Sequence, residues 1–178
     1  MEGLDAIHKL LMTQRPVDWA AMPDIALYMD QVISYLPRQT IDTGDEPPLT
    51  SAMVNNYIKD GLLPRANGKR YNKEHLAYLT AIVLLKNVLS VKDIKLLLGE
   101  QIHEGEVEDF YEHFLEKLDT SLEDVASVVD DSIGSEDISE YAMNLAIVSC
   151  AAKIACVQLL SLLRSQREPE ESAKEKKG

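Results

Sequence analysis

Residues 53–76, MVNNYIKDGLLPRANGKRYNKEHL, constrain the fold more than any other part of the chain. A helical run reaches Gly61, and glycine adopts the left-handed conformation of a helix C-terminus without steric strain. The dipeptide Asn67-Gly68 favours the positive φ angles of a tight hairpin turn. Asn72 can then accept a hydrogen bond at the start of the next helix. The stretch predicts a helix, a β-hairpin and a second helix in close succession.

Residues on the N-terminal side of this stretch predict another helix. Within residues 22–36, apolar side chains from Ile25 onward recur at helical spacing, and Pro37 ends the pattern. A polar connector of loop composition follows. The helix that leads to Gly61 is expected to begin at Leu49 or Thr50.

Capping patterns predict two further helix starts on the C-terminal side. Ser90 opens a short helix that Gly99 is expected to end. Thr120 and Glu123 have the spacing of a second capping box within the acidic half. The chain is therefore expected to be mainly α.

The charge of the chain is strongly negative but unevenly distributed. The formal net charge of the 178 residues is −12, which argues against indiscriminate nucleic-acid binding. Residues 50–98 nevertheless hold eight Lys or Arg against three acidic residues, a local charge of +5. Residues 100–140 hold fifteen acidic residues and Lys117 as their one Lys or Arg, a local charge of −14. A basic module is followed by an acidic one.

The order helix, Gly-Leu-Leu-Pro, basic hairpin, Arg-Tyr and helix is typical of winged helix-turn-helix DNA-binding domains. Three segments resemble the MerR-type regulators in particular: NYIKDGLLP at 56–64, Arg70-Tyr71, and EHLAYLTAIVLLKNVLSVKDIKLLL at 74–98. This resemblance implies a winged helix-turn-helix module with a small β-hairpin wing. The whole chain also resembles an uncharacterised bacterial family, domain of unknown function 1836, through LYMDQ and NNYIKDGLLP. That second resemblance implies no activity.

We therefore expect four parts along the chain. An N-terminal helical segment with its connector, 1–47, precedes a winged helix-turn-helix domain at 48–99. An acidic helical dimerisation domain follows at 100–166, built as a helical bundle with a long apolar helix. The charged residues 167–178 are expected to form a disordered tail.

The predicted DNA contacts come from the helix before Gly61 and from the turn after it. A helix can enter the major groove, asparagine can pair with adenine, and cations on a wing can neutralise flanking phosphates. The resemblance implies phosphate contacts for Tyr57 and Arg70 and a wing-anchoring role for Tyr71. A solvated turn and an ordinary helix surface are the alternatives. The predicted DNA-binding residues are Thr50, Ser51, Asn55, Asn56, Tyr57, Lys59, Arg65, Lys69, Arg70 and Tyr71.

The last predicted helix, residues 138–164, is apolar on two opposite sides, which requires two partners. The acidic half can cover one side and a second subunit the other. A central helix of a monomeric core is the alternative, whereas a membrane span is disfavoured because Lys153 near its centre would cost about 2.5–3.5 kcal/mol. The predicted dimerisation residues are Leu145, Val148, Ala152, Ala155, Leu159 and Leu162.

No pattern in the sequence indicates catalysis, a metal or a bound cofactor. His103 and His113 are surrounded by acidic residues, but zinc-binding helices present histidines three or four positions apart, far closer than these two. Cys150 and Cys156 are about 240° apart around a helix, so we expect buried, reduced thiols. Neither a phosphate-binding glycine loop nor a nucleophile motif is present. We therefore expect a protein that is not an enzyme and needs no cofactor.

Together these features predict a cytoplasmic, homodimeric transcriptional regulator that binds double-stranded DNA. The start of the chain, MEGLDAIHKL, lacks the pattern of a secretory signal. The alternative is a non-catalytic interaction or scaffold protein whose winged helix does not bind DNA. Asn55 and Asn56 support this alternative, since MerR-type proteins commonly carry Arg and Tyr at these two places. The sequence identifies neither an effector ligand nor a preferred DNA sequence.

Overall fold

A computed structural model describes residues 2–38, 41, 48–103, 105–129 and 133–175. The fold is mainly helical, with one small antiparallel sheet and one long apolar helix, which confirms the coarse prediction. Of the predicted tail, the backbone is helical as far as Glu175, and residues 176–178 lie outside the described part. In chain order the elements are α1 (Glu2–Thr13), the 3-10 helix η1 (Trp19–Ala21), β1 (Leu27–Tyr28), α2 (Met29–Tyr35), the 3-10 helix η2 (Leu36–Arg38), α3 (Ser51–Lys59), β2 (Arg70–Tyr71), α4 (Lys73–Leu85), α5 (Val91–Gln101), α6 (Val107–Ala126) and α7 (Ile138–Glu175).

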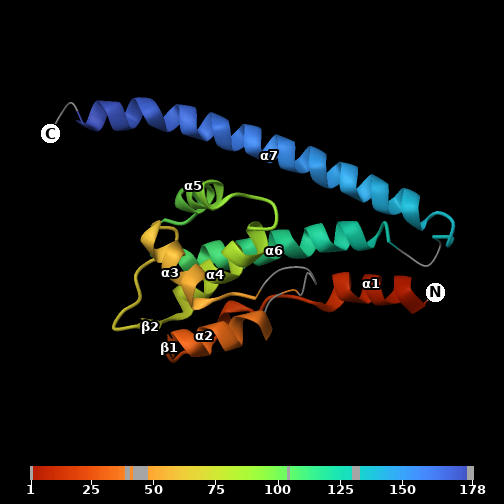
Figure 1. Ribbon diagram of the computed structural model, residues 1–178, viewed down its shortest axis with the longest axis horizontal. Coiled ribbons are helices and arrows are strands. Elements are labelled where there is room, and N and C mark those ends of the chain that lie inside the picture. Colours follow the sequence, from red (N-terminus) through yellow and green to blue (C-terminus); the bar gives the residue numbers. More distant parts are fainter. Residues whose placement is uncertain (1, 39–40, 42–47, 104, 130–132, 176–178) are drawn as a thin grey trace.

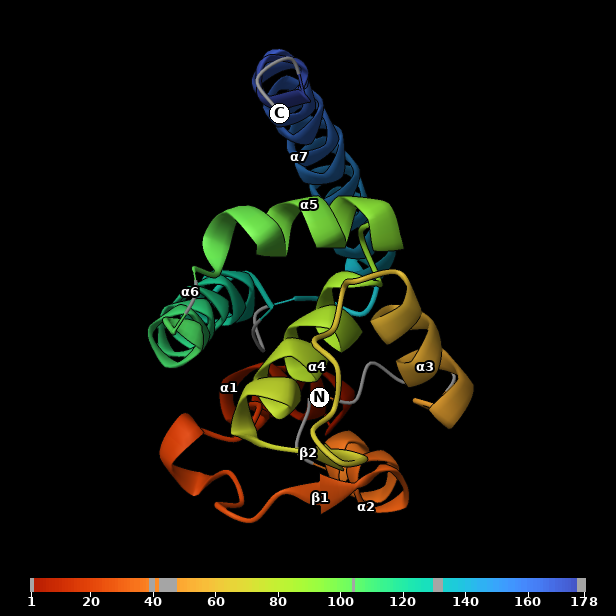
Figure 2. The same cartoon turned by 90° about the vertical axis from the view of Figure 1, so that its left-hand side faces the viewer.

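Helix α4 lies at the centre of the fold because its composition leaves it no polar face. Seven of its thirteen residues are buried, and α2, α3, α5 and α6 surround it (Figure 2). The hydroxyl of Thr80 is buried but donates to the carbonyl oxygen of Leu76 at 2.9 Å, so its burial costs little. α4 is therefore the support against which both α3 and β2 are positioned.

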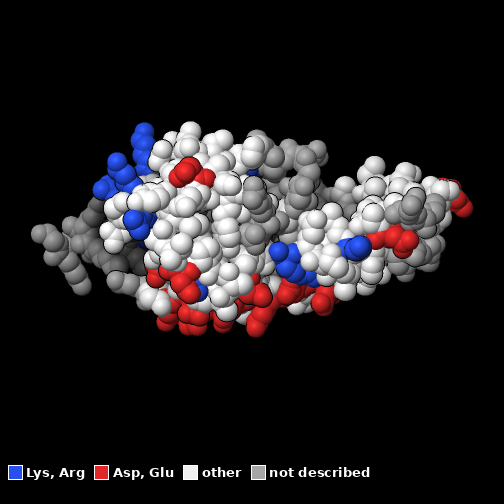
Figure 3. Space-filling view, turned by 90° about the horizontal axis from the view of Figure 1, so that it is seen from below, with Lys and Arg blue, Asp and Glu red and all other residues white. Residues whose placement is uncertain are grey.

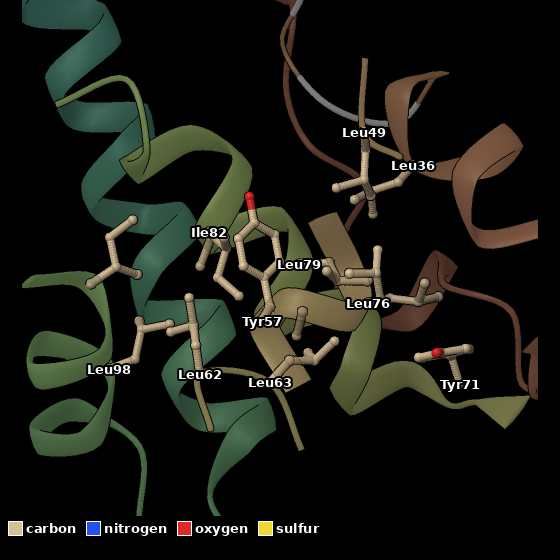
Figure 4. Packing of buried hydrophobic residues seen from close by; sticks show 14 of the residues in the cluster. Leu36, Leu49, Tyr57, Leu62, Leu63, Tyr71, Leu76, Leu79, Ile82 and Leu98 are labelled. Atoms are coloured by element: carbon tan, nitrogen blue, oxygen red, sulfur yellow. The ribbon is translucent and has the colours of Figure 1, made fainter. Parts of the chain in front are cut away.

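One hydrophobic core joins the basic module to the acidic half. The same cluster of buried residues includes Tyr111 from α6 and Leu160 from α7. The hydroxyl of Tyr111 donates to the carbonyl oxygen of Val17 at 2.7 Å, which ties α6 to the segment before η1. Figure 4 shows how core residues of the basic module and of the segment before it meet around α4, namely Leu36, Leu49, Tyr57, Leu62, Leu63, Tyr71, Leu76, Leu79, Ile82 and Leu98.

The two strands of the sheet come from distant parts of the chain. β1 pairs antiparallel with β2, with Leu27 opposite Tyr71 and Tyr28 opposite Arg70. The helix predicted from Ile25 is therefore wrong in its first residues, because Leu27 and Tyr28 are extended and α2 begins only afterwards. Most of the predicted connector between α2 and α3 lies outside the described residues.

The predicted hairpin is confirmed only as a tight turn. Asn67 and Arg70 form a single antiparallel bridge, and the strand that pairs with β2 is β1. The positive φ angles, predicted at Asn67 and Gly68, are found at Gly68 and Lys69. The pairing of β2 with β1 was not predicted, because β1 is only two residues long, too short for alternating hydrophobicity to mark it as a strand.

Three predicted helix starts are confirmed by their hydrogen bonds. Thr50, Asn72 and Ser90 each accept, through the side-chain oxygen, a bond from the backbone N–H three residues later at 3.2–3.3 Å. The predicted left-handed residue after α3 is also confirmed, since Gly61 has a φ of +68°. Local sequence patterns were sufficient at these positions.

Two predicted boundaries are wrong. α5 continues past Gly99 for a further two residues, and α6 continues through Thr120 as one helix. The hydroxyl of Thr120 donates to the carbonyl oxygen of Glu116 at 3.0 Å, a bond that threonine commonly makes inside a helix. A capping pattern does not interrupt α6 because Leu118 and Leu122 continue its half-buried apolar stripe.

Helix α7 runs along one side of the molecule, over nearly its whole length (Figure 1). Among its described side chains, which end at Arg167, Leu160 is the one that is buried. Cys150, predicted to be buried, is exposed because α7 meets the core along only one side. In the described chain, residues 138–167 form the one helix long and apolar enough to cross a membrane, and 6% of its most apolar part is buried.

Candidate nucleic-acid interface

The polar flank of α3 is exposed along the whole helix. Val54, at 0% exposed, and Tyr57, at 6%, occupy the opposite flank and lie in the core. The end of α3 is fixed by hydrogen bonds from the N–H groups of Leu62 and Leu63 to the carbonyl oxygen of Tyr57, at 2.8 and 3.1 Å. The exposed residues of the polar flank are Thr50, Ser51, Asn55, Asn56 and Lys59.

The turn before β2 presents Lys69 at its tip. Gly68 and Lys69 have φ angles of +55° and +66°, as the two central residues of a type I′ turn require. The backbones of Asn67 and Arg70 close the turn with two hydrogen bonds of 3.1 and 3.0 Å. Lys69 is exposed and has no ion pair within the described residues.

Arg70 is held against Tyr28 of the neighbouring strand. Its Nη2 donates to the Tyr28 hydroxyl at 2.9 Å, and its guanidinium carbon lies 4.8 Å from the centre of the Tyr28 ring. The guanidinium has five N–H donors, so most of them remain available to a ligand. Tyr28 was not among the predicted site residues, because its contact with Arg70 depends on the pairing of β1 with β2.

The two tyrosines predicted at this site lie in the core. Tyr57 is 6% exposed and Tyr71 is 4% exposed, and burial raises the pKa of Tyr71. The Tyr71 ring packs edge-on against His75, with 5.4 Å between ring centres. Tyr71 thereby holds β2 against α4. Tyr57 lies on the side of α3 that packs against the core, so the exposed flank does not include it.

His75, which the sequence analysis also missed, links α4 to the turn. Its Nδ1 accepts from the N–H of Asn72 at 3.3 Å, and its Nε2 lies 3.3 Å from the carbonyl oxygen of Arg65. Burial lowers the pKa of His75, although the Arg65 carbonyl and Glu74 oppose this effect. The Nδ1 also contacts the Oδ1 of Asn72, and the tautomer of the ring decides which nitrogen donates. The position three residues after the Asn72 cap was the signal in the sequence.

An open cleft of about 750 Å³ continues the basic surface from α3 onto α5. Its floor includes the buried residues Leu62 and Leu63, and no Asp or Glu of the described chain lines it. Lys95 is fixed there because its Nζ donates to the carbonyl oxygen of Asp60 at 2.6 Å. The lysines of α5 contribute to the local charge of residues 50–98, but no sequence pattern places them beside α3. The cations that line the cleft are Lys59, Arg65, Lys92, Lys95 and Arg167.

Charges of opposite sign occupy different parts of the surface. Figure 3 shows a group of Lys and Arg at the end of the molecule that carries α3 and the turn, a row of Asp and Glu along one edge, and further Lys and Arg beside that row. Helix α6, whose acidic residues are exposed except for the half-buried Asp119, lies on the opposite side of α4 from α3 (Figure 2). Within the described residues, no carboxylate pairs with Lys59, Arg65 or Lys69. The polar flank of α3 is therefore open to an anionic ligand.

The histidines of the acidic half do not meet at a common site. His113 lies 3.6 Å from the carboxylate of Glu116 on the exposed face of α6, and His103 is exposed after the end of α5. In the described part of the chain, no group of three or more His, Cys, Asp or Glu could hold a metal ion.

Comparison with known families gives one match. The family model for a domain of unknown function, DUF1836, matches residues 17–114, more than half of the chain. No curated protein and no solved structure matched the chain. The matched segment contains α2 to α5, both strands and the first turns of α6, and it excludes α7. The family thus covers the candidate interface, and the chain belongs to the DUF1836 family.

Proposed function

We propose that the protein binds double-stranded DNA through α3 and the turn before β2, and that it acts as a transcriptional regulator. The exposed polar flank of α3, next to a basic turn and a basic cleft in an otherwise acidic protein, is the observation that carries this proposal. The order β1, α2, α3, turn, β2 and α4 is compatible with a winged helix-turn-helix domain. The resemblance of residues 50–98 to MerR-type regulators supports the same assignment. In this proposal α3 is the recognition helix and the turn is the wing.

The flank of α3 has the side chains for base contacts. The amide groups of Asn55 and Asn56 are exposed, and each offers the donor and acceptor that match adenine N6 and N7 in the major groove. Ser51 lies in the first turn of α3, where a hydroxyl and the positive end of the helix dipole favour a phosphate. Asn55 and Asn56 would then select the sequence, while Ser51 would orient the helix.

The wing has the side chains for phosphate contacts. Lys69 and Arg70 lie at and beside the tip of the turn, and Lys59 and Arg65 line the cleft. The contact with Tyr28 already orients Arg70, so less side-chain entropy is lost when a phosphate binds. Each phosphate that a cation neutralises releases condensed counterions, which makes the binding dependent on salt.

The proposal is tested by measuring the affinity of the protein for a random-sequence duplex. Fluorescence anisotropy gives this affinity at each of several salt concentrations. About four phosphate contacts predict a log-log slope of about −3 to −4. The double variant Lys69→Ala, Arg70→Ala should bind every sequence more weakly and should reduce the slope by about 2 in magnitude. Lys117→Ala, which removes an exposed cation from α6, is the matched control and should bind as the unmodified protein does. A wild-type chain without duplex affinity at low salt contradicts the proposal.

A protein-interaction role is the second candidate, and the composition of the flank favours it. Lys59 is the only cation on the exposed flank of α3, because Asn55 and Asn56 are neutral. A selection from random oligonucleotides separates the two candidates. If α3 reads bases, Asn55→Ala should change the preferred base at one position and leave the rest of the selected site unchanged. If the module binds a protein, no sequence should be enriched.

A further inference from the structure

Helix α7 exposes large apolar side chains along most of its length. Isolated exposed apolar residues are ordinary, but a contiguous row on one helix marks a surface that another molecule covers. Six such side chains are between 58% and 64% exposed, namely Met143, Ile147, Val148, Ile154, Leu159 and Leu162.

The opposite side of α7 is attached to the core of its own subunit. Leu160 is 2% exposed within the main hydrophobic cluster. Arg164 pairs with Asp93, and Arg167 pairs with Glu100, so both arginines bind α5. These contacts fix the rotation of α7 about its own axis and define which residues face outward. The half-buried residues on the attached side are Cys156, Val157 and Leu163.

Helical geometry places most of the predicted dimerisation residues on one strip of the exposed side. At 100° per residue, five of them lie within about 80° of one another, with Leu160 about 120° from the middle of the group. The sixth, Leu145, is half-buried beside the small cluster of Leu4, Val129 and Ile133. We call the five exposed residues the outer strip, which consists of Val148, Ala152, Ala155, Leu159 and Leu162.

We propose that a second copy of the chain covers the outer strip, with the two α7 helices antiparallel about a two-fold axis near residues 153 and 154. Val148 and Leu159 are equally distant from this point along the chain, and so are Ala152 and Ala155. Two-fold symmetry then places Val148 against Leu159 of the partner subunit, and Ala152 against Ala155 of the partner subunit. The alanines permit a close approach at the crossing, and the larger side chains pack on either side.

The size of α7 is sufficient for such an interface. Residues 138–167 span about 45 Å of helix at 1.5 Å per residue. A stable complex buries about 800 Å² on each partner. The outer strip and the exposed side chains that flank it, Met143, Ile147 and Ile154, extend over most of this length. A second α7 therefore provides a cover of matching length and apolar character.

The distribution of charge favours the antiparallel arrangement over the parallel one. α3 and α5 lie below the C-terminal half of α7, whereas α1 and the end of α6 lie below its N-terminal half (Figure 1). An antiparallel pair keeps apart the two basic ends, which carry α3 and the turn. Each chain carries a net charge of −12. A parallel pair places like charges of the two chains side by side, where they repel each other.

A lipid bilayer fits the outward side less well than a second copy does. Lys153 would lie near the bilayer centre, where a charged side chain is costly, and Asn144 and Gln158 are also polar. A spanning α7 would in addition lose the burial of Leu160 and the ion pairs of its two arginines with α5.

Light scattering after size exclusion, with two complementary variants of the full chain, tests both the dimer and its direction. The wild type should have twice the chain mass of 19.9 kDa. Val148→Glu and Leu159→Lys should each weaken self-association by at least tenfold, because each variant places a charge against an apolar side chain. An equimolar mixture should form the dimer again, since the introduced carboxylate of one variant then faces the introduced ammonium group of the other across one antiparallel pair.

Matched controls make each outcome decisive. Val128→Glu adds the same charge at a 48%-exposed valine outside α7 and should remain dimeric. Circular dichroism should be unchanged in all variants, since the substituted side chains are exposed.

A wild-type monomer at about 100 μM, where even a micromolar dimer is formed, overturns the proposal. So does a mixture that stays monomeric, or a wild type that floats with phosphatidylcholine–phosphatidylglycerol vesicles and is monomeric without them. None of these measurements involves DNA, so the proposed function stands or fails separately.

Discussion

Helices α4 and α7 are both rich in apolar residues, but α4 is enclosed by other helices and α7 is mostly exposed. Seven of the thirteen residues of α4 are buried by helices of the same chain. In the described part of α7, Leu160 alone is buried. An apolar composition therefore indicates that a helix must be covered, but it does not indicate whether the covering surface belongs to the same chain.

Shortening one leucine in each helix tests this comparison, and the change in α4 should have the largest effect. Leu79 is 0% exposed, so Leu79→Ala should cost about 2–5 kcal/mol of unfolding free energy through lost burial and the cavity left behind. Leu162 is 61% exposed, so Leu162→Ala in dilute protein should change the unfolding free energy by less than about 0.5 kcal/mol. Urea unfolding followed by circular dichroism measures both. A large effect of Leu162→Ala that does not vary with protein concentration would mean that the chain itself buries α7.

Tyr111 tests whether α6 belongs to the same enclosed core as α4. Tyr111→Phe removes the hydrogen bond to the carbonyl oxygen of Val17 and should cost about 1–2 kcal/mol at neutral pH. Burial raises the pKa of Tyr111 from 10.0 to about 12. The stability that this group contributes is therefore complete below pH 10 and is lost as the pH rises toward 12. Unfolding free energies measured between pH 9 and 12 should fall less steeply for Tyr111→Phe than for the wild type, and parallel declines would contradict the burial of this hydroxyl.

Arg164 tests the attachment of α7 to α5, and its effect should be the smallest. Its pair with Asp93 is partly exposed, so Arg164→Ala should cost at most about 1 kcal/mol. The hydrogen bond from Ser90 and then the contact with Arg164 lower the pKa of Asp93. The variant should move that pKa upward, toward its ordinary value, in an NMR titration of the Asp93 carboxyl group. Ser165→Ala, an exposed neighbour, is the control and should leave the titration unchanged.

Local sequence patterns predicted those parts of the fold that depend on neighbouring residues. The caps at Thr50, Asn72 and Ser90 and the left-handed Gly61 need only groups within three or four residues, and all four are confirmed. The short strand β1 could not be predicted, because its extended conformation depends on pairing with β2, more than forty residues away. The false boundary at Thr120 has the opposite cause: a good local cap yields to a continuing helix packed by tertiary contacts.

The sequence predicted which types of residue form the candidate interface, but not which residues contact one another there. The polar residues of α3 and the cations of the turn could be identified from spacing and charge, and they are exposed as expected. The contact of Tyr28 with Arg70 and that of His75 with the Arg65 carbonyl connect separate segments, so no periodicity indicates them. Tyr57 was predicted to contact phosphate because of the resemblance. The packing of α3 against the core instead encloses its side chain.

Helix α5 binds two other helices through residues that are only two positions apart. Lys95 holds the carbonyl oxygen of Asp60, at the last turn of α3, and Asp93 holds Arg164 of α7. A single helical turn of α5 therefore connects the end of α3 to the attached side of the longest helix.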